Sequence, residues 1–190
     1  MIKITDLDKL NSQNPKIKYG FAKDLVKIGS EKPELLYEYF DYWAELLSSD
    51  NSILKWTAID IIGYLSAVDR ENKIDGLMAD LIKMLHSGVL ITCNHAIFAL
   101  GLIYQNKPNL KDLIIRELIL IPHDKFETDE CKNIAIGKIL ETIKPFVSDL
   151  RENQSVVSFI ENATKSERNS TKKKAEQLLK KGWVSDEILQ

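Results

Sequence analysis

Cys93 and His95 are the first residues in this sequence whose chemistry suggests a site, because a thiolate and an imidazole both bind zinc. They fall within an apolar segment that reads as a helix. Residues two apart on a helix point in roughly opposite directions, so this pair cannot bind one metal ion without distorting the helix. We therefore expect a core cysteine and a histidine that lies in the core or in a groove, and we predict no metal site and no cofactor.

A second group of potential metal ligands lies in the segment 123–130. The segment precedes a helical pattern at residues 131–143, and acidic side chains close to a helix N-terminus interact favourably with the helix dipole. We interpret it as a solvated loop between helices and not as a metal site. Its potential ligands are His123, Asp124, Glu127, Asp129 and Glu130.

The motifs of the common enzyme classes are absent from the sequence. It contains no HExxH, CxxC or GxSxG motif. Gly137-Lys138 lacks the glycine five residues earlier that a phosphate-binding loop requires. We predict that the protein is not an enzyme.

Composition and charge narrow the class of protein further. The chain has 190 residues and a formal net charge of −2, so it has no overall positive charge to attract nucleic acid. Its two cysteines are too few for a disulfide framework. The N-terminal residues lack the basic-then-apolar pattern of a secretion signal. The apolar segment at 89–104 is shorter than the roughly 20 residues that a membrane span needs. We expect a cytoplasmic protein with reduced thiols and no membrane association.

Apolar residues recur at a spacing of three to four through most of the chain, and no segment alternates as a strand would. Proline and glycine divide this pattern, so that Pro15 opens a helix and Gly29-Ser30 ends it. The helix at 89–105 is apolar on all sides, and we expect other elements to surround it. After a short opening helix near Thr5, the pattern predicts helices at 15–28, 33–47, 52–67, 75–86, 89–105, 110–121, 131–143, 149–163 and 166–181.

One alanine in the second helix of each pair indicates a repeat. An alanine lets neighbouring helices approach, and an aliphatic residue one turn later fills the layer between them. The pattern therefore predicts stacked helical hairpins. The alanines are Ala22, Ala58, Ala96, Ala135 and Ala175, separated by 36, 38, 39 and 40 residues. The aliphatic residues are Val26, Ile62, Leu100, Ile139 and Leu179.

In this register the chain resembles the HEAT-like family of helical repeats, whose units of about 40 residues form two antiparallel helices. The Asp and Arg that often mark a HEAT unit are kept only in part, because Asp50 fits while the third unit has Ser87-Gly88. The resemblance implies an all-α, right-handed α-solenoid of about five antiparallel hairpins. We expect a single domain over 1–190, with approximate repeats at 1–30, 31–68, 69–106, 107–146 and 147–182 and a tail at 183–190.

The positions two before and two after each alanine lie on the opposite face of the second helices, which usually lines the concave surface of a solenoid. Armadillo-type relatives hold extended peptides with ladders of Asn and Trp, so the resemblance implies a peptide-binding groove. Alternatively, Trp56 and Phe98 pack against neighbouring repeats. The first row is Gly20, Trp56, Asn94, Asn133 and Lys173, and the second is Asp24, Asp60, Phe98, Gly137 and Gln177. From these we predict partner contacts by Trp56, Asp60, Asn94, Phe98, Asn133 and Lys173.

Nucleic-acid binding is the alternative function. Trp56 and Asp60 are similar to the Trp-xxx-Asp step of the DNA alkylation-repair glycosylases, which are built on HEAT-like repeats. In that family the Trp contacts the damaged nucleotide and the carboxylate stabilises the cationic sugar. A duplex-binding surface normally carries a basic stripe. Here only residues 151–181 are basic, with eight Lys and Arg against four Asp and Glu.

We therefore expect a non-catalytic scaffold or adaptor that binds a protein or an extended peptide along its concave face. The sequence leaves the oligomeric state open. A second candidate surface is an acidic stripe on the helix at 33–47, opposite its apolar face. The stripe comprises Glu34, Glu38, Asp41 and Glu45.

Overall fold

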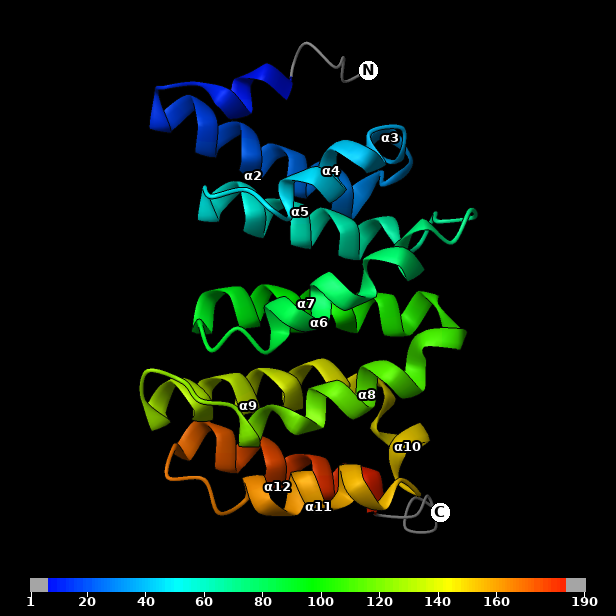
Figure 1. Cartoon of the computed structure of the whole chain (residues 1–190). Coiled ribbons are helices and arrows are strands. Elements are labelled where there is room, and N and C mark those ends of the chain that lie inside the picture. The colour runs from blue at the N-terminus through cyan, green and yellow to red at the C-terminus, as the bar shows by residue number, and fades with distance from the viewer. Residues whose placement is uncertain (1–6, 184–190) are drawn as a thin grey trace. The chain divides into compact units, whose positions relative to one another are not determined.

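The computed structural model describes residues 7–183, with side chains up to residue 180, and every regular element in that range is helical (Figure 1). The chain forms two compact units. As far as residues are described, the first comprises Met1–Met84 and Phe98–Leu110, and the second comprises Leu85–Ile97 and Lys111–Gln190. Helix α7 (Leu90–Asn106) contributes its first half to the second unit and its second half to the first. Within the described range, no helix is long and apolar enough to cross a membrane.

In the first unit, α2 and α4 both pack on α5. The predicted opening helix near Thr5 begins outside the described residues, and the first described element is a short 3-10 helix. The elements of this unit are η1 (Asp8–Asn11), α2 (Pro15–Glu31), α3 (Glu34–Tyr37), α4 (Phe40–Leu46), α5 (Ser52–Leu65), η2 (Lys73–Leu77), most of α6 (Met78–Leu85) and η3 (Pro108–Leu110).

Helix α2 begins as predicted, because Asn14 caps the first turn by accepting a hydrogen bond from Lys16 N at 3.0 Å and Pro15 follows. Its predicted end at Gly29-Ser30 is wrong, since the helix continues to Glu31. Gly29 is buried, and a Cβ there would lie 3.4 Å from the ring of Tyr64. Gly29 therefore lies within α2 on its buried side and does not end the helix.

The single helix predicted at 33–47 is also wrong, because the chain forms two short helices, α3 and α4, with a break at Glu38 and Tyr39. The buried indole of Trp43 donates a hydrogen bond from Nε1 to the carbonyl oxygen of Leu36 at 3.0 Å. This bond satisfies a carbonyl at the end of α3. The acidic stripe on these two helices is exposed along its whole length, as predicted.

In the second unit, α12 packs on both α9 and α11. The helix predicted at 149–163 starts later than expected, because Asn153 accepts hydrogen bonds from Ser155 N and Val156 N and so caps a new helix. Of the predicted tail, residues 184–190 lie outside the described range. The elements are α8 (Lys111–Leu120), η4 (Ile121–His123), α9 (Asp129–Ile143), η5 (Lys144–Phe146), α10 (Val147–Leu150), α11 (Gln154–Ala163) and α12 (Asn169–Trp183).

The alanines of the predicted register are all buried, with 3% exposure or less. Among the aliphatic residues one turn later, Ile62, Leu100 and Ile139 are fully buried, while Val26 and Leu179 are half-buried. The prediction that these positions face the core is therefore confirmed. The prediction that the segment 89–105 is surrounded on all sides is wrong for its first residues, since Val89 is 55% exposed and Ile91 is 50% exposed.

Candidate binding groove

A groove of about 640 Å³ lies in the second unit, between the end of α8 with η4 on one side and α11 on the other. Residues from α9 also line it. Its volume is in the range of binding sites for small molecules and short segments. The lining residues are Ile119, Leu120, Pro122, His123, Asn133, Ile136, Gln154, Ser155, Ser158, Phe159, Asn162, Ala163, Lys165 and Ser166.

One wall of the groove is apolar and open to solvent. Leu120, the last residue of α8, keeps 41% of its surface exposed, which is high for a leucine. Ile119 and Pro122 flank it along the wall, and Phe159 of α11 is buried beneath the groove with 6% exposure. Ile119 and Pro122 are half-buried, so Leu120 is the exposed member of this wall, and apolar side chains of this kind line most binding pockets.

The opposite wall is polar and uncharged, because α11 is amphipathic. Val156, Phe159 and Ile160 turn into the core of the second unit. The face that remains carries Gln154, Ser158 and Asn162, which are exposed and line the groove. Side chains of this kind offer both donors and acceptors without the cost of burying a charge.

Charge in the groove has one sign. Among the described residues that line it, none is acidic, whereas Lys165 carries a positive charge. Lys165 is exposed and lies just beyond the end of α11. The groove therefore favours a neutral or acidic occupant.

Asn133 of α9 lines the groove and is held in a fixed orientation. Its Oδ1 accepts a hydrogen bond from Ser166 Oγ at 2.7 Å, and the same hydroxyl accepts from Arg168 N at 3.3 Å. The carbonyl oxygen of Asn133 accepts from Thr171 Oγ1 at 2.8 Å. With one lone pair of Oδ1 used in this way, the side chain still offers two N–H donors on Nδ2 and one acceptor position on Oδ1.

Comparison with known proteins identifies the fold. No protein-family model matches the chain, and no curated protein matches its sequence. Among solved structures, a designed armadillo repeat protein is similar over 94% of this chain and 98% of its own, with 17% identity and a TM-score of 0.51. The fold is an armadillo- or HEAT-like helical repeat.

Two engineered proteins solved by the Northeast Structural Genomics Consortium are also similar in structure to this chain. One matches over 92% of this chain with 17% identity and a TM-score of 0.58, and this chain covers 46% of its length. The other matches over 93% of this chain and 96% of its own, with 14% identity and a TM-score of 0.54. The all-α helical-repeat fold predicted from the alanine register is thus confirmed.

The residues predicted to bind a partner fall in both units. Trp56 and Asp60 lie one turn apart on α5 in the first unit, are half-buried and contact other groups. Phe98 of the same unit packs its ring on Tyr64, edge to face, with 5.5 Å between ring centroids. For Phe98, this contact agrees with the packing alternative.

In the second unit, the structure brings one predicted residue, Asn133, into the groove. Asn94 is half-buried on α7, and its Oδ1 is buried without a hydrogen bond. Lys173 is exposed on α12 and does not line the groove. Leu120 and the polar face of α11 were missed by the sequence analysis, although the polar residues at 154, 158 and 162 are a signal that can be found in the sequence.

The residues considered for metal binding have other roles in the structure: Cys93 is part of the core, and Asp124 pairs with a histidine. Cys93 is fully buried, and burial, with a smaller effect of Asp124, raises the pKa of its thiol to about 12. His86 Nδ1 lies 2.7 Å from Asp124 Oδ2, and His86 Nε2 lies 3.4 Å from Glu117 Oε2. The segment 123–130 is therefore not purely solvated, since Asp124 binds back to the end of α6. Among the described residues, no group of three potential ligands could hold a metal ion.

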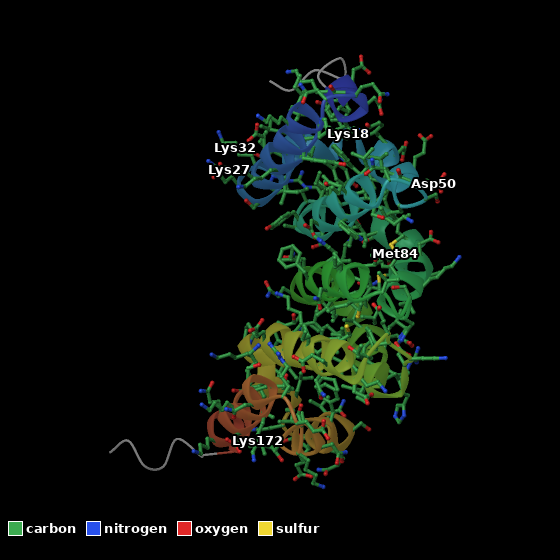
Figure 2. All side chains as sticks on the ribbon, turned by 90° about the vertical axis from the view of Figure 1, so that its left-hand side faces the viewer. Lys18, Lys27, Lys32, Asp50, Met84 and Lys172 are labelled. Carbon is green, nitrogen blue, oxygen red and sulfur yellow. The ribbon has the colours of Figure 1, made fainter. Side chains whose placement is uncertain are left out.

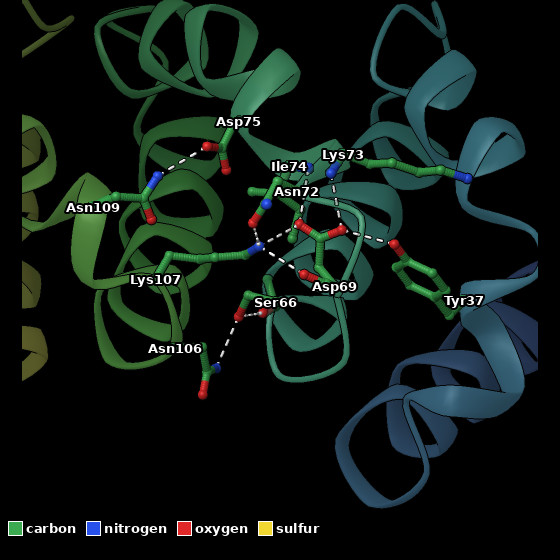
Figure 3. A network of polar contacts seen from close by, with 11 residues as sticks. Tyr37, Ser66, Asp69, Asn72, Lys73, Ile74, Asp75, Asn106, Lys107 and Asn109 are labelled. Carbon is green, nitrogen blue, oxygen red and sulfur yellow. Dashed lines mark hydrogen bonds and ion pairs between the residues drawn. The ribbon is translucent and has the colours of Figure 1, made fainter.

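A buried polar network joins two repeats within the first unit (Figure 3). Asp69 and Lys107 stand at equivalent positions, each eleven residues after a register alanine. Lys107 Nζ lies 2.7 Å from Asp69 Oδ2, and it donates hydrogen bonds to Asp69 O at 2.7 Å and to Asn72 Oδ1 at 2.8 Å. The three N–H donors of the ammonium group are thus matched by three acceptors.

Asp69 also accepts a hydrogen bond from the hydroxyl of Tyr37 at 2.8 Å. Burial alone would raise the pKa of Asp69, but the hydrogen bonds from Lys107, Tyr37 and two backbone N–H groups lower it below its usual value. Burial and the Asp69 carboxylate raise the pKa of Tyr37 to about 12. The charged form of Asp69 and the neutral form of Tyr37 are both favoured, as in a structural network that holds repeats together.

Proposed function

We propose that this protein is a non-catalytic scaffold or adaptor and that the groove of the second unit is its protein-binding surface. The observation that carries the proposal is the composition of the groove, in which the exposed wall around Leu120 faces the uncharged polar side of α11. Such a surface combines apolar contact area with hydrogen-bonding groups that need no paired charge. It suits recognition of another polypeptide.

A role without catalysis is supported by the state of the reactive groups. The Cys93 thiol is buried and stays protonated, and Lys107 is fully engaged in an ion pair and hydrogen bonds. Neither group is placed to act as a nucleophile or base. A cytoplasmic location is part of the proposal, because two cysteines are too few for the disulfide framework of a small secreted domain.

The test is affinity capture from the source organism with three forms of the protein. Leu120→Asp places a charge in the apolar wall, while Ile91→Asp places the same charge on a residue of the second unit that is 50% exposed and does not line the groove. We expect the wild type and Ile91→Asp to capture the same protein and Leu120→Asp to lose it. Equal capture by all three forms would show that the groove is not the binding surface.

Nucleic-acid binding is the second candidate, and the exposed lysines of α12 favour it. Lys172, Lys173 and Lys180 are all exposed, and Figure 2 labels Lys172 on this helix. A gel shift with plain and alkylated duplex DNA at several salt concentrations separates the two functions. Binding that strengthens steeply at low salt and that is lost in Lys172→Glu/Lys173→Glu would favour nucleic acid over a protein partner.

A further inference from the structure

Helix α2 carries a row of three lysines on its solvent side, Lys16, Lys23 and Lys27, which we call the lysine stripe. At 3.6 residues per turn, the three side chains lie within about 40° of one another around the helix axis, and the buried Leu25 lies about 180° from Lys16. All three lysines are exposed. Lys16 and Lys23 form no ion pair with another described residue, and Lys27 has only the surface pair with Glu31 at 4.0 Å. The ammonium groups of the stripe are therefore available to another molecule.

Two exposed apolar residues of α2 flank the lysine stripe. Tyr19 lies about 60° to one side of Lys16, and Ile17 lies about 100° to the other side. The two acids of α2, Asp24 and Glu31, are both on the Ile17 side. The surface between the stripe and Tyr19 is therefore positive and partly apolar, and it favours a partner that is acidic and partly apolar.

The acidic stripe on α3 and α4 has the complementary composition. Its four carboxylates, Glu34, Glu38, Asp41 and Glu45, are exposed and form no ion pair with another described residue. Leu35, beside Glu34, is an exposed apolar residue. Together with the two on α2, it completes the set of large apolar residues that are exposed in the described part of the first unit. The exposed apolar surface of this unit thus accompanies the two stripes.

Each stripe also contains charges of one sign that repel each other. Lys23 and Lys27 are one turn apart on α2, and Asp41 and Glu45 are one turn apart on α4. Like charges at this spacing destabilise a helix. A partner of opposite charge relieves the repulsion, so each stripe gains from contact with the other.

The two stripes belong to one chain but face different directions, which decides how they can meet. Figure 2 shows Lys27 of α2 and Asp50, which follows α4, on opposite sides of the first unit. One molecule therefore cannot present both stripes to the same face of a neighbour. The lysine stripe of one copy meets the acidic stripe of the next copy, and such a heterologous contact repeats along an open chain or closes into a ring.

We propose that the protein self-associates head to tail, with the lysine stripe and Tyr19 of one copy on the acidic stripe and Leu35 of the next. The formal net charge of −2 is small for a chain of 190 residues, so two copies repel each other little at long range. Exposed ion pairs are individually weak, so the association is reversible and depends on salt. It involves the first unit alone and goes beyond the proposed function of the groove, which holds or fails independently.

Sedimentation velocity of the full chain over a range of protein concentrations tests the proposal. At about 0.1 M salt, we expect the average mass to rise with concentration beyond that of a dimer. An increase to about 1 M salt shortens the Debye length from about 10 Å to about 3 Å and should lower the association constant at least tenfold. Two triple variants, each with helical content checked by circular dichroism, should stay monomeric: Lys16→Glu/Lys23→Glu/Lys27→Glu and Glu38→Lys/Asp41→Lys/Glu45→Lys.

A mixture of the two triple variants is the sharpest form of the test. Each variant carries one native stripe and one stripe of reversed charge, so in an equimolar mixture every stripe again meets its complement on the other variant. We expect the mixture to regain assemblies larger than a dimer, although neither variant forms them alone. The matched control reverses three exposed lysines of α12 and should associate as the wild type does: Lys172→Glu/Lys173→Glu/Lys180→Glu.

Three outcomes would overturn the proposal. The first is a wild type that stays monomeric at low salt or stops at a dimer whose mass rises no further with concentration. The second is loss of association in the α12 control as well, which would trace the effect to net charge and not to the stripes. The third is a mixture of the two folded triple variants that remains monomeric, which would show that the stripes do not bind each other.

Discussion

Lys107 Nζ lies 2.7 Å from Asp69 Oδ2 across two successive repeats of the first unit, with side chains that are only 6% and 0% exposed. A buried ion pair of this kind adds little over an apolar pair of the same shape, but removal of one partner leaves the other charge buried without compensation. We therefore expect that replacing one partner destabilises the protein strongly and that replacing both destabilises it much less.

Lys107→Met should lower the free energy of unfolding by about 3–5 kcal/mol, because the carboxylate of Asp69 stays buried. Urea denaturation measures the change. Lys27→Met is the control, since Lys27 pairs with Glu31 at 4.0 Å on the surface, and its loss should cost less than about 1 kcal/mol. If the double variant Asp69→Asn/Lys107→Met were as unstable as the sum of the two single variants, the two residues would not act as a pair.

Tyr37 should make the stability of the protein sensitive to alkaline pH. Its pKa is raised from 10.0 to about 12 in the folded protein, so the neutral hydroxyl contributes stability that is fully present below pH 10 and is lost as the pH rises toward 12. Denaturation curves between pH 8 and pH 12 follow this loss. Tyr37→Phe should be less stable at neutral pH and should show a smaller fall in this window, whereas parallel curves for the two proteins would contradict the assignment.

Asp69 has the opposite dependence on pH. Because its pKa is lowered from 3.8, the ionised carboxylate contributes stability that is present above pH 3.8 and is lost as the pH falls through the lower folded value. Asp69→Asn should therefore flatten the acid limb of the stability curve. An acid limb identical to that of the wild type would show that other carboxylates control acid unfolding.

Gly63 and Gly20 should respond in opposite directions to the same substitution. A Cβ at Gly63 would lie 2.8 Å from the Cα atom of Ala99 and 3.0 Å from its Cβ, so Gly63→Ala should force the helices apart and cost about 1–3 kcal/mol. At Gly20, in the interior of α2, nothing lies within 4 Å of such a Cβ, and Gly20→Ala should stabilise the protein by about 0.5–1 kcal/mol. Thermal melts of both variants measure the difference.

The two cysteines should differ in reactivity. Cys131 is half-buried, whereas Cys93 is fully buried and its thiol has a pKa near 12. A thiol reagent at pH 8 should label one thiol of the native protein quickly and both thiols in denaturant. Rapid labelling of Cys93 in the native protein would contradict this prediction and show that the N-terminal turn of α7 opens.

Much of the fold follows from local patterns in the sequence. The alanine register identifies the buried side of each second helix, because close packing of helices depends on residue size at a fixed period. The continuation of α2 past Gly29 to Glu31 and the break between α3 and α4 do not follow from these local patterns. The ion pair of Asp69 with Lys107 is equally long-range.

The groove could be predicted only in part. The polar row on α11 is visible in the sequence, as is the buried face that opposes it. Leu120 looks like an ordinary core residue, because its exposure depends on where α8 ends relative to α11. The repeat register predicts Asn133 on the concave row of second-helix residues, whereas the groove beside α11 and the hydrogen bond to Ser166 are visible only in the structure.

Hydrogen–deuterium exchange with and without the protein captured by the wild type tests the location of the binding surface most directly. The groove predicts slower exchange in two segments of the second unit, 119–123 and 154–166, with no change in residues 52–65, which carry Trp56 and Asp60. Slower exchange in 52–65 and in 94–98, with the groove segments unchanged, would contradict the account and assign binding to the row of second-helix residues instead.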